Sequence, residues 1–153
     1  MTTKTHTLTD GRCRPLVIAV TPGQAGDSTQ LTRLLNELHV DRLAGGPART
    51  TPTALRADKA YSSKAIRAML RRRGITAVIP EPEDQKRNRA RRGSRGGRPV
   101  TLDQQDYKNR NVVERGFNHI KHWRGLATRY DKHALIFRGG VVLRAILLWL
   151  TTA

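Results

Sequence analysis

TKTHTLTDGRCRPLVIAVT, residues 3–21, carries the pattern that decides the fold. Residues 3–9 alternate Thr with other side chains, and β-branched residues in alternation predict a strand. Asp10 and Gly11 then form a tight-turn signal. Residues 15–21 are almost entirely apolar or β-branched, which predicts a second strand. The chain is therefore expected to open with a β-hairpin.

Helices and strands alternate outward from this hairpin. Leucines at helical spacing over 31–38 predict a first helix, which Asp27 or Ser28 is expected to cap. Ser62 is expected to cap a second helix, which Gly74 closes. The order predicts a mixed α/β fold. The remaining expected elements are strands over 53–57 and 75–79, a helix running to 73, a long helix over 102–124 and a final helix over 134–150.

Positive charge is concentrated in the middle of the chain. The 153 residues hold 29 Lys and Arg against 12 Asp and Glu, a formal charge of +17. Residues 86–98 contain seven bases, three glycines and no acid. We expect a flexible basic loop over 81–100 that contacts nucleic-acid phosphates by counterion release, the alternative being a merely solvated loop. The expected DNA-binding residues are Lys86, Arg87, Arg89, Arg91, Arg92, Arg95 and Arg98.

Composition also limits the classes of ligand and the cellular compartment that we expect for the protein. Aromatic residues make up only 5%, which argues against a stacking surface for single-stranded nucleic acid. Cys13 is the only cysteine, so an internal disulfide is excluded and a reducing, cytoplasmic setting is expected. The apolar segment 134–150 is interrupted by Arg138 and Arg144, which favours a core helix over a membrane span.

Four polar residues recur along the predicted helix 102–124. Tyr107, Arg110, Glu114 and Lys121 are separated by three, four and seven residues, which places them within about a 60° arc of one helix face. An ionised Glu114 between cations can hold a divalent metal, although the geometry alone favours ordinary Arg110–Glu114 pairing. Asp58 follows a predicted strand, where ligand sites form in α/β sheets.

These residues resemble a known signature. Tyr107-x2-Arg110-x3-Glu114-x6-Lys121 is similar to the Y-x2-R-x3-E-x6-K signature of bacterial insertion-sequence DDE transposases of the insertion-sequence-five-like group. The segment 57–61, ADKAY, resembles the A-D-K-G-Y segment of that family, with Ala60 where glycine is usual. Residues 2–6, 16–28 and 147–150 are similar to that group too, so the resemblance extends along essentially the whole chain.

The resemblance implies a ribonuclease-H-like mixed sheet with flanking helices and a DDE triad that binds two Mg²⁺ (or Mn²⁺). Asp58 would be the second acid and Glu114 the third, both metal ligands, while Tyr107, Arg110 and Lys121 would position phosphates or the glutamate. The implied activity is metal-dependent cleavage and transfer of DNA strands.

The family's first aspartate lies on a central strand upstream of the hairpin. Residues 1–153 are therefore expected to be the C-terminal part of a catalytic domain, without that strand and inactive alone. Expected partners are double-stranded DNA (transposon ends and target), the product of an upstream reading frame and further copies of the complete protein. The expected location is the cytoplasm, at the nucleoid, with no membrane.

Two other classes of function stay open from the sequence. A non-catalytic basic DNA-binding regulator or remnant would need residues 86–98 but neither Asp58 nor Glu114. A basic RNA-binding protein of the ribosomal type would fit the charge and the low aromatic content, but it leaves the four-residue pattern unexplained. The effect of neutralising the two acids discriminates the enzyme from the binders.

Overall fold

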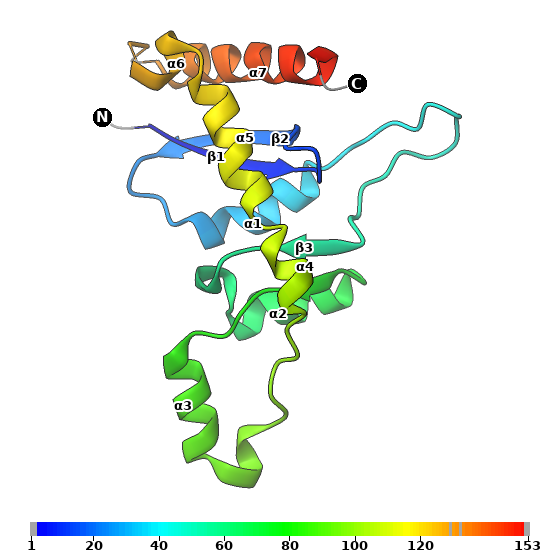
Figure 1. The fold of residues 1–153 in the computed structure, drawn as a ribbon, viewed down its shortest axis with the longest axis vertical. Helices are drawn as coiled ribbons and strands as arrows, with labels where there is room; N and C mark the ends of the chain where they lie inside the picture. The colour runs from blue at the N-terminus through cyan, green and yellow to red at the C-terminus, as the bar shows by residue number, and fades with distance from the viewer. Residues whose placement is uncertain (1–2, 129, 132, 152–153) are drawn as a thin grey trace. The chain divides into compact units, whose positions relative to one another are not determined.

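The computed structural model describes residues 3–128, 130–131 and 133–151. The chain divides into two compact units: unit 1 comprises Met1–Thr50 and Asn111–Ala153, and unit 2 comprises Thr51–Arg110. The middle of the sequence therefore forms one unit, and its two ends together form the other (Figure 1).

Unit 1 is built on the expected hairpin. Strands β1 and β2 pair antiparallel, with an irregularity between Leu8 and Thr9. In the turn the carboxylate of Asp10 accepts the backbone N–H groups of Arg12 and Arg14, each at 2.9 Å. The elements of unit 1 are β1 (Thr3–Thr9), β2 (Pro15–Pro22), α1 (Asp27–Asn36), α5 (Asn111–Lys121), α6 (Arg124–Thr128) and α7 (Ala134–Thr151).

Strand β2 separates two apolar clusters in unit 1, because successive side chains point to opposite faces of a strand. Val17 and Ala19 pack with Leu34 and Leu38 of the α1 region. Ile18, on the other face, packs against α5, α6 and α7, and Figure 1 shows α5 crossing the hairpin. The second cluster comprises Ile18, Ile120, Leu126, Phe137, Val141, Ala145 and Leu148.

Helix α7 has an apolar surface on more than one side. Phe137 and Val141 lie in the core, as expected for a core helix. Leu135 and Leu150, by contrast, are 82% and 71% exposed. The helix is long and apolar enough to cross a membrane by length and composition, and 22% of it is buried. The expectation of a core helix therefore describes one face of α7.

Unit 2 contains a short parallel sheet. Strands β3 and β4 pair from Ala54 opposite Thr76 to Arg56 opposite Val78. Leu70 and Ile79 are fully buried, and Gly74, with φ +69°, ends the helix before β4 as predicted. The elements of unit 2 are β3 (Ala54–Arg56), η1 (Lys59–Tyr61), α2 (Lys64–Arg72), β4 (Thr76–Val78), α3 (Glu83–Arg91), η2 (Gly93–Gly96) and α4 (Gln104–Lys108).

The mixed α/β class is confirmed. Among the described residues the strands form two separate two-stranded sheets, β1–β2 and β3–β4. A mixed arrangement of small sheets and flanking helices is compatible with a ribonuclease-H-like domain. The absence of a central first strand stays a prediction.

The expected caps of both helices are wrong. Gly26 is the N-cap of α1, and Asp27 is the first helical residue, because its carboxylate binds Lys4 and His6 instead. Ser63 caps α2 by accepting the N–H of Ile66 at 3.1 Å. The side chain of Ser62 is used elsewhere in unit 2.

The predicted long helix over 102–124 is interrupted. Helix α4 ends with Asn109 as its C-cap, and α5 begins at Asn111. The Asn109 side-chain amide donates to the Asp106 carboxylate, a local hydrogen bond that competes with helical backbone bonds. Arg110 pairs with Asp58. The expectation that Tyr107, Arg110, Glu114 and Lys121 share one continuous helix face is therefore wrong.

The expected loop over 81–100 is wrong as secondary structure, because most of it is helical. Helix α3 begins with Glu83 and Asp84, which favour a helix N-terminus, and continues through good helix formers. The glycines come only after the helix, and Gly93 and Gly97 adopt positive φ. The helix has no buried apolar face, so the sequence pattern does not indicate it.

Candidate functional site

Asp58 lies just beyond the end of β3, as predicted. It is the N-cap of η1, and one carboxylate oxygen accepts the backbone N–H of Lys59. The side chain is 51% exposed. One carboxylate oxygen is thus bound locally, and the other, Oδ2, is the one that faces Arg110.

Unit 2 brings Arg110 and Tyr107 to this carboxylate. The Nη1 atom of Arg110 lies 3.5 Å from Oδ2 of Asp58. The same guanidinium lies over the Tyr107 ring, 5.6 Å from the ring centroid. A guanidinium stacked on an aromatic ring keeps a fixed plane and can donate two parallel hydrogen bonds to a phosphate. Three of the five predicted catalytic residues are thus assembled within one unit.

A second ion pair holds these residues in place, and the sequence analysis missed it. Arg56, on β3, donates from Nε and Nη2 to one carboxylate oxygen of Asp106, at 2.9 and 2.5 Å. The hydrogen bond from Arg56 lowers the pKa of Asp106. Because Asp106 immediately precedes Tyr107, the pair fastens α4 to the strand that leads to Asp58. The sequence signal for this pair is the opposite charge of two residues, Arg56 just before Asp58 and Asp106 just before Tyr107.

Glu114 and Lys121 lie in unit 1. Both are on α5 and exposed, separated by two helical turns. The neighbouring face of α5 is in the core through Val112 and Ile120. The pairing of Glu114 with Asp58 as joint metal ligands stays a prediction, since each belongs to a separate unit.

The seven predicted DNA-binding residues divide into two groups. Arg89 is 20% exposed and bound to Glu81, which is 12% exposed, and Lys86 pairs with Glu83 at 3.2 Å. The other five are exposed and have no carboxylate partner within the described parts of the chain. This second group comprises Arg87, Arg91, Arg92, Arg95 and Arg98.

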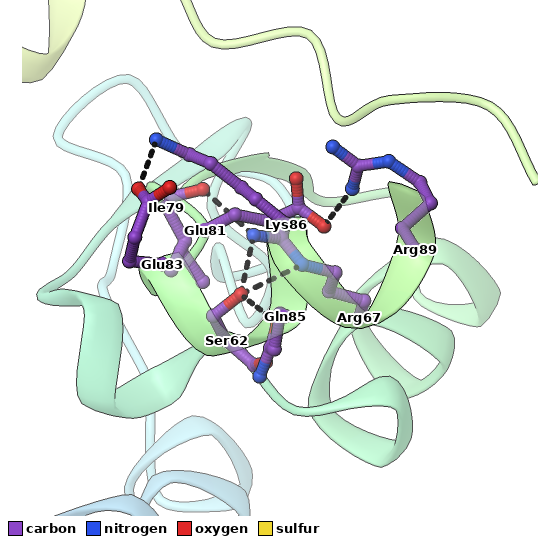
Figure 2. A network of polar contacts seen from close by, with 8 residues as sticks. All are labelled: Ser62, Arg67, Ile79, Glu81, Glu83, Gln85, Lys86 and Arg89. Carbon is purple, nitrogen blue, oxygen red and sulfur yellow. Dashed lines mark hydrogen bonds and ion pairs between the residues drawn. The ribbon is translucent and has the colours of Figure 1, made fainter. Parts of the chain in front are cut away.

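A polar network secures the start of α3 (Figure 2). The Gln85 amide nitrogen donates to the Ser62 carbonyl oxygen at 2.6 Å, and the Ser62 hydroxyl donates to Gln85 Oε1 at 3.1 Å. Arg67 donates to Ser62 Oγ at 2.8 Å and to the Ile79 carbonyl at 2.7 Å. Gln85 had no predicted role, because neither its spacing nor its neighbours mark it in the sequence.

A family described as the transposase DDE domain matches residues 1–150. The chain belongs to this family. It is 32% identical over 150 residues to a "putative transposase for insertion sequence element IS6501" from Brucella ovis, covering 98% of this chain and 99% of that protein.

A second relative of this DDE-domain chain is longer. A "putative transposase for insertion sequence element IS402" from Burkholderia cepacia is 32% identical over 131 residues, 86% of this chain and 54% of that protein. The chain thus matches nearly all of one relative and about half of the other. No solved structure matches it significantly. Family membership assigns the chain to DNA transposition.

DDE transposase domains typically use a divalent metal, for which this chain offers carboxylate donors. In the described ranges no group of three or more His, Cys, Asp or Glu side chains forms a metal-binding cluster. Asp58 and Glu114 are nevertheless hard oxygen donors of the type Mg²⁺ accepts, and Mg²⁺ is commonly held by one or two carboxylates together with substrate phosphates. Each of the two carboxylates is therefore chemically suited to such an ion.

Proposed function

We propose that this chain carries two of the acids of a metal-dependent DNA strand-transfer site, Asp58 and Glu114. The observation that carries the proposal is the assembly of Asp58, Arg110 and Tyr107 in unit 2. A half-exposed carboxylate beside an aromatic-backed guanidinium suits a phosphodiester, since the arginine binds phosphate oxygens and the carboxylate binds their metal. The site would act on chromosomal DNA in the cytoplasm.

The residues would divide the work as follows. Arg110 orients the scissile phosphate through its guanidinium, and Tyr107 fixes the plane of that guanidinium. Lys121 contributes positive charge on α5 toward phosphate. The Mg²⁺ or Mn²⁺ that Asp58 and Glu114 would hold supplies a water of lowered pKa and neutralises charge on the phosphate.

The exposed arginines of α3 and η2 would hold the duplex. Arg87, Arg91, Arg92, Arg95 and Arg98 are free of carboxylates in the described structure, so each can replace a counterion on the DNA backbone. This observation also favours the second candidate function, a basic DNA-binding regulator without catalysis. The two functions differ in their dependence on the acids.

An assay of Mg²⁺-dependent nicking of labelled duplex DNA tests the proposal. The inputs are this chain alone, the chain joined to the product of its upstream reading frame, and the joined form with Asp58→Asn or Glu114→Gln. We expect nicking by the joined form and a loss of at least about 100-fold in either variant, because even residues outside the metal's first shell cost 10- to 100-fold.

Asp41→Asn serves as the matched control, since Asp41 is a 90% exposed carboxylate in a loop. It makes the same change of charge and should leave nicking unaltered. A joined form that binds DNA but never nicks it would contradict the strand-transfer proposal and favour the regulator. Equal losses in Asp41→Asn would show that charge alone, and no ligand role, explains the effect.

A further inference from the structure

The turn that carries Asp58 is connected directly to the basic helix α3. Ser62 follows η1 immediately and is 3% exposed, and Gln85 lies in the first turn of α3. Their two hydrogen bonds, at 2.6 and 3.1 Å, run in opposite directions. We call this pair of bonds the Ser62–Gln85 joint (Figure 2).

Arg67 fixes the direction of the hydrogen bonds in the joint. Its guanidinium donates to Ser62 Oγ, so the Ser62 hydroxyl hydrogen is left for Gln85 Oε1. The Gln85 nitrogen then faces the Ser62 carbonyl, and each group in the joint has a partner. A satisfied, mostly buried network of this kind favours a single orientation of the helix.

The far part of α3 is held as well. Arg89 is bound to Glu81, in the segment between β4 and α3. A Cβ atom on Gly96 would overlap the Arg89 carbonyl oxygen, so η2 approaches α3 as closely as only glycine permits. The arginines without carboxylate partners therefore lie on α3 and around η2, two elements that are held in place by these contacts.

We propose that the Ser62–Gln85 joint positions α3, by fixing the direction of this helix relative to the Asp58 turn. A DNA duplex bound on α3 would then present a defined phosphate of the DNA backbone to Asp58. The inference rests on the proposed function, in which α3 binds DNA and Asp58 serves the reaction. Ser62 and Gln85 are positioning residues and touch no phosphate themselves.

A distance between two spin labels tests the joint directly. Labels are attached at Lys59→Cys, beside Asp58, and at Ala90→Cys, on α3, both exposed positions. The native Cys13 is replaced by Asn, which tolerates its positive φ of 66°. We expect a narrow distribution of label distances in the full chain and a clearly broader one with Gln85→Met, which keeps the side-chain length and the helix propensity.

Gln104→Met is the matched control, because Gln104 is an exposed residue of α4 and the joint does not involve it. It should leave the distribution narrow. Gln85→Glu keeps an oxygen for the Ser62 hydroxyl but loses the amide donor, so it should give an intermediate width. Equal widths in the native, Gln85→Met and Gln85→Glu proteins would overturn the proposal.

Binding to a labelled duplex over a range of salt concentrations supplies the functional readout. Gln85→Met should weaken binding by about threefold to tenfold, the effect of one or two net hydrogen bonds, while the salt dependence stays the same. An unchanged salt dependence means that the same phosphates are contacted by a less ordered helix. A reduced salt dependence, or an unchanged affinity, would overturn the positioning role.

The two proposals fail in different ways. If the native chain binds no duplex, DNA contact by α3 is refuted, and the positioning role that rests on it falls, even if the label distances confirm a rigid joint. If the native chain binds normally and Gln85→Met changes neither distances nor affinity, only the joint is refuted. Far-UV circular dichroism of each variant, compared with that of the native chain, checks that the helix content of the whole chain is unchanged in both comparisons.

Discussion

At the scale of single residues, the hairpin turn and α5 depend on one close approach. Cys13 adopts φ +66°, which is unusual for a residue other than glycine. An ideal Cβ built on Gly116 would lie 3.0 Å from the Cys13 carbonyl oxygen. The absence of a side chain at Gly116 therefore lets α5 pack against a turn that has little freedom to move.

Gly116→Ala is expected to destabilise the protein. Alanine favours a helix over glycine, but the clash with a backbone oxygen outweighs this, for a net loss of about 1–2 kcal/mol in the free energy of unfolding. Urea unfolding measures it. Gly139→Ala on α7 is the control, since its Cβ would meet nothing within 4 Å, and it should be neutral or stabilising. If Gly116→Ala instead raises the free energy of unfolding, the turn at Cys13 moves to accommodate the added Cβ and the prediction is wrong.

Among the described residues of unit 1, His6 is a titratable residue that is buried. Its Nε2 lies 2.7 Å from Thr21 Oγ1 and its Nδ1 lies 3.1 Å from the Asp27 carboxylate. Burial lowers the pKa of His6 and outweighs Asp27, which raises it, while Lys4 and Arg33 lower it further. The native state therefore binds fewer protons at His6 than the unfolded state does.

Stability should consequently fall in acid. The contribution of His6 is complete above the unfolded pKa of 6.5 and is lost as the pH falls through the lower native pKa. The midpoint of urea unfolding should decrease between pH 7.5 and 5 in the native protein and less so in His6→Gln. His39→Gln, at an exposed histidine, should retain the native pH dependence. Identical pH profiles for all three would contradict this prediction.

Some residue-level features could be predicted and others could not. The position of Asp58 after a strand follows from local pattern, and the structure agrees. The roles of Asp27 and Ser62 do not, because both can cap a helix and the choice depends on partners distant in sequence, His6 for one and Gln85 for the other. Hydrogen bonds over such separations leave no local signal.

At the scale of secondary-structure elements, α3 separates arginines that the sequence treats alike. Arg87 is exposed, whereas Arg89 is held by Glu81. Both carry the same charge within the same helix. If α3 contacts DNA as proposed, only the first can neutralise a phosphate without breaking an ion pair.

Arg87→Gln and Arg89→Gln therefore form a charge-matched test. Arg87→Gln should lower duplex affinity and reduce the salt slope by about 0.9, the contribution of one phosphate contact. Arg89→Gln should leave the slope nearly unchanged and instead lower the thermal midpoint, because Glu81 loses its partner. Binding isotherms at several salt concentrations measure both. Equal slope changes would show that Arg89 also reaches DNA.

Elements with strong local periodicity were predictable, and interruptions were not. The hairpin, the leucine-rich α1 and the apolar α7 follow from their patterns. The break between α4 and α5 does not, because it arises where Arg110 pairs with Asp58, 52 positions earlier in the chain. High charge and three nearby glycines predict a loop where α3 forms, although the residue types of α3 itself favour a helix.

At the scale of the whole molecule, one unit interrupts the other in sequence. The two apolar clusters on either side of β2 are made only of residues within 1–50 and 111–153. Both tryptophans, Trp123 and Trp149, belong to that unit. Tryptophan fluorescence therefore reports unit 1 alone, while far-UV circular dichroism reports both units.

Replacing Thr51–Arg110 by a flexible linker of about 15 residues should leave unit 1 folded. Two of its apolar clusters are built from unit 1 residues alone, so we expect the cooperative fluorescence transition in urea to persist with a similar midpoint. A loss of that transition would show that unit 2 is required for the fold of unit 1. A linker of about 25 residues controls for strain in the connection.

The return of the chain to unit 1 has a consequence for biosynthesis. A protein emerges from the ribosome from its N-terminus, so unit 2 is complete at Arg110 while the Ile18 face of the hairpin still waits for Phe137 and Val141. A chain that stops before α7 leaves the Ile18 face of the strand only partly covered, by Ile120 and Leu126, which favours aggregation or proteolysis. A mutation that removes α7 would thus also destabilise the hairpin, which is synthesised before it.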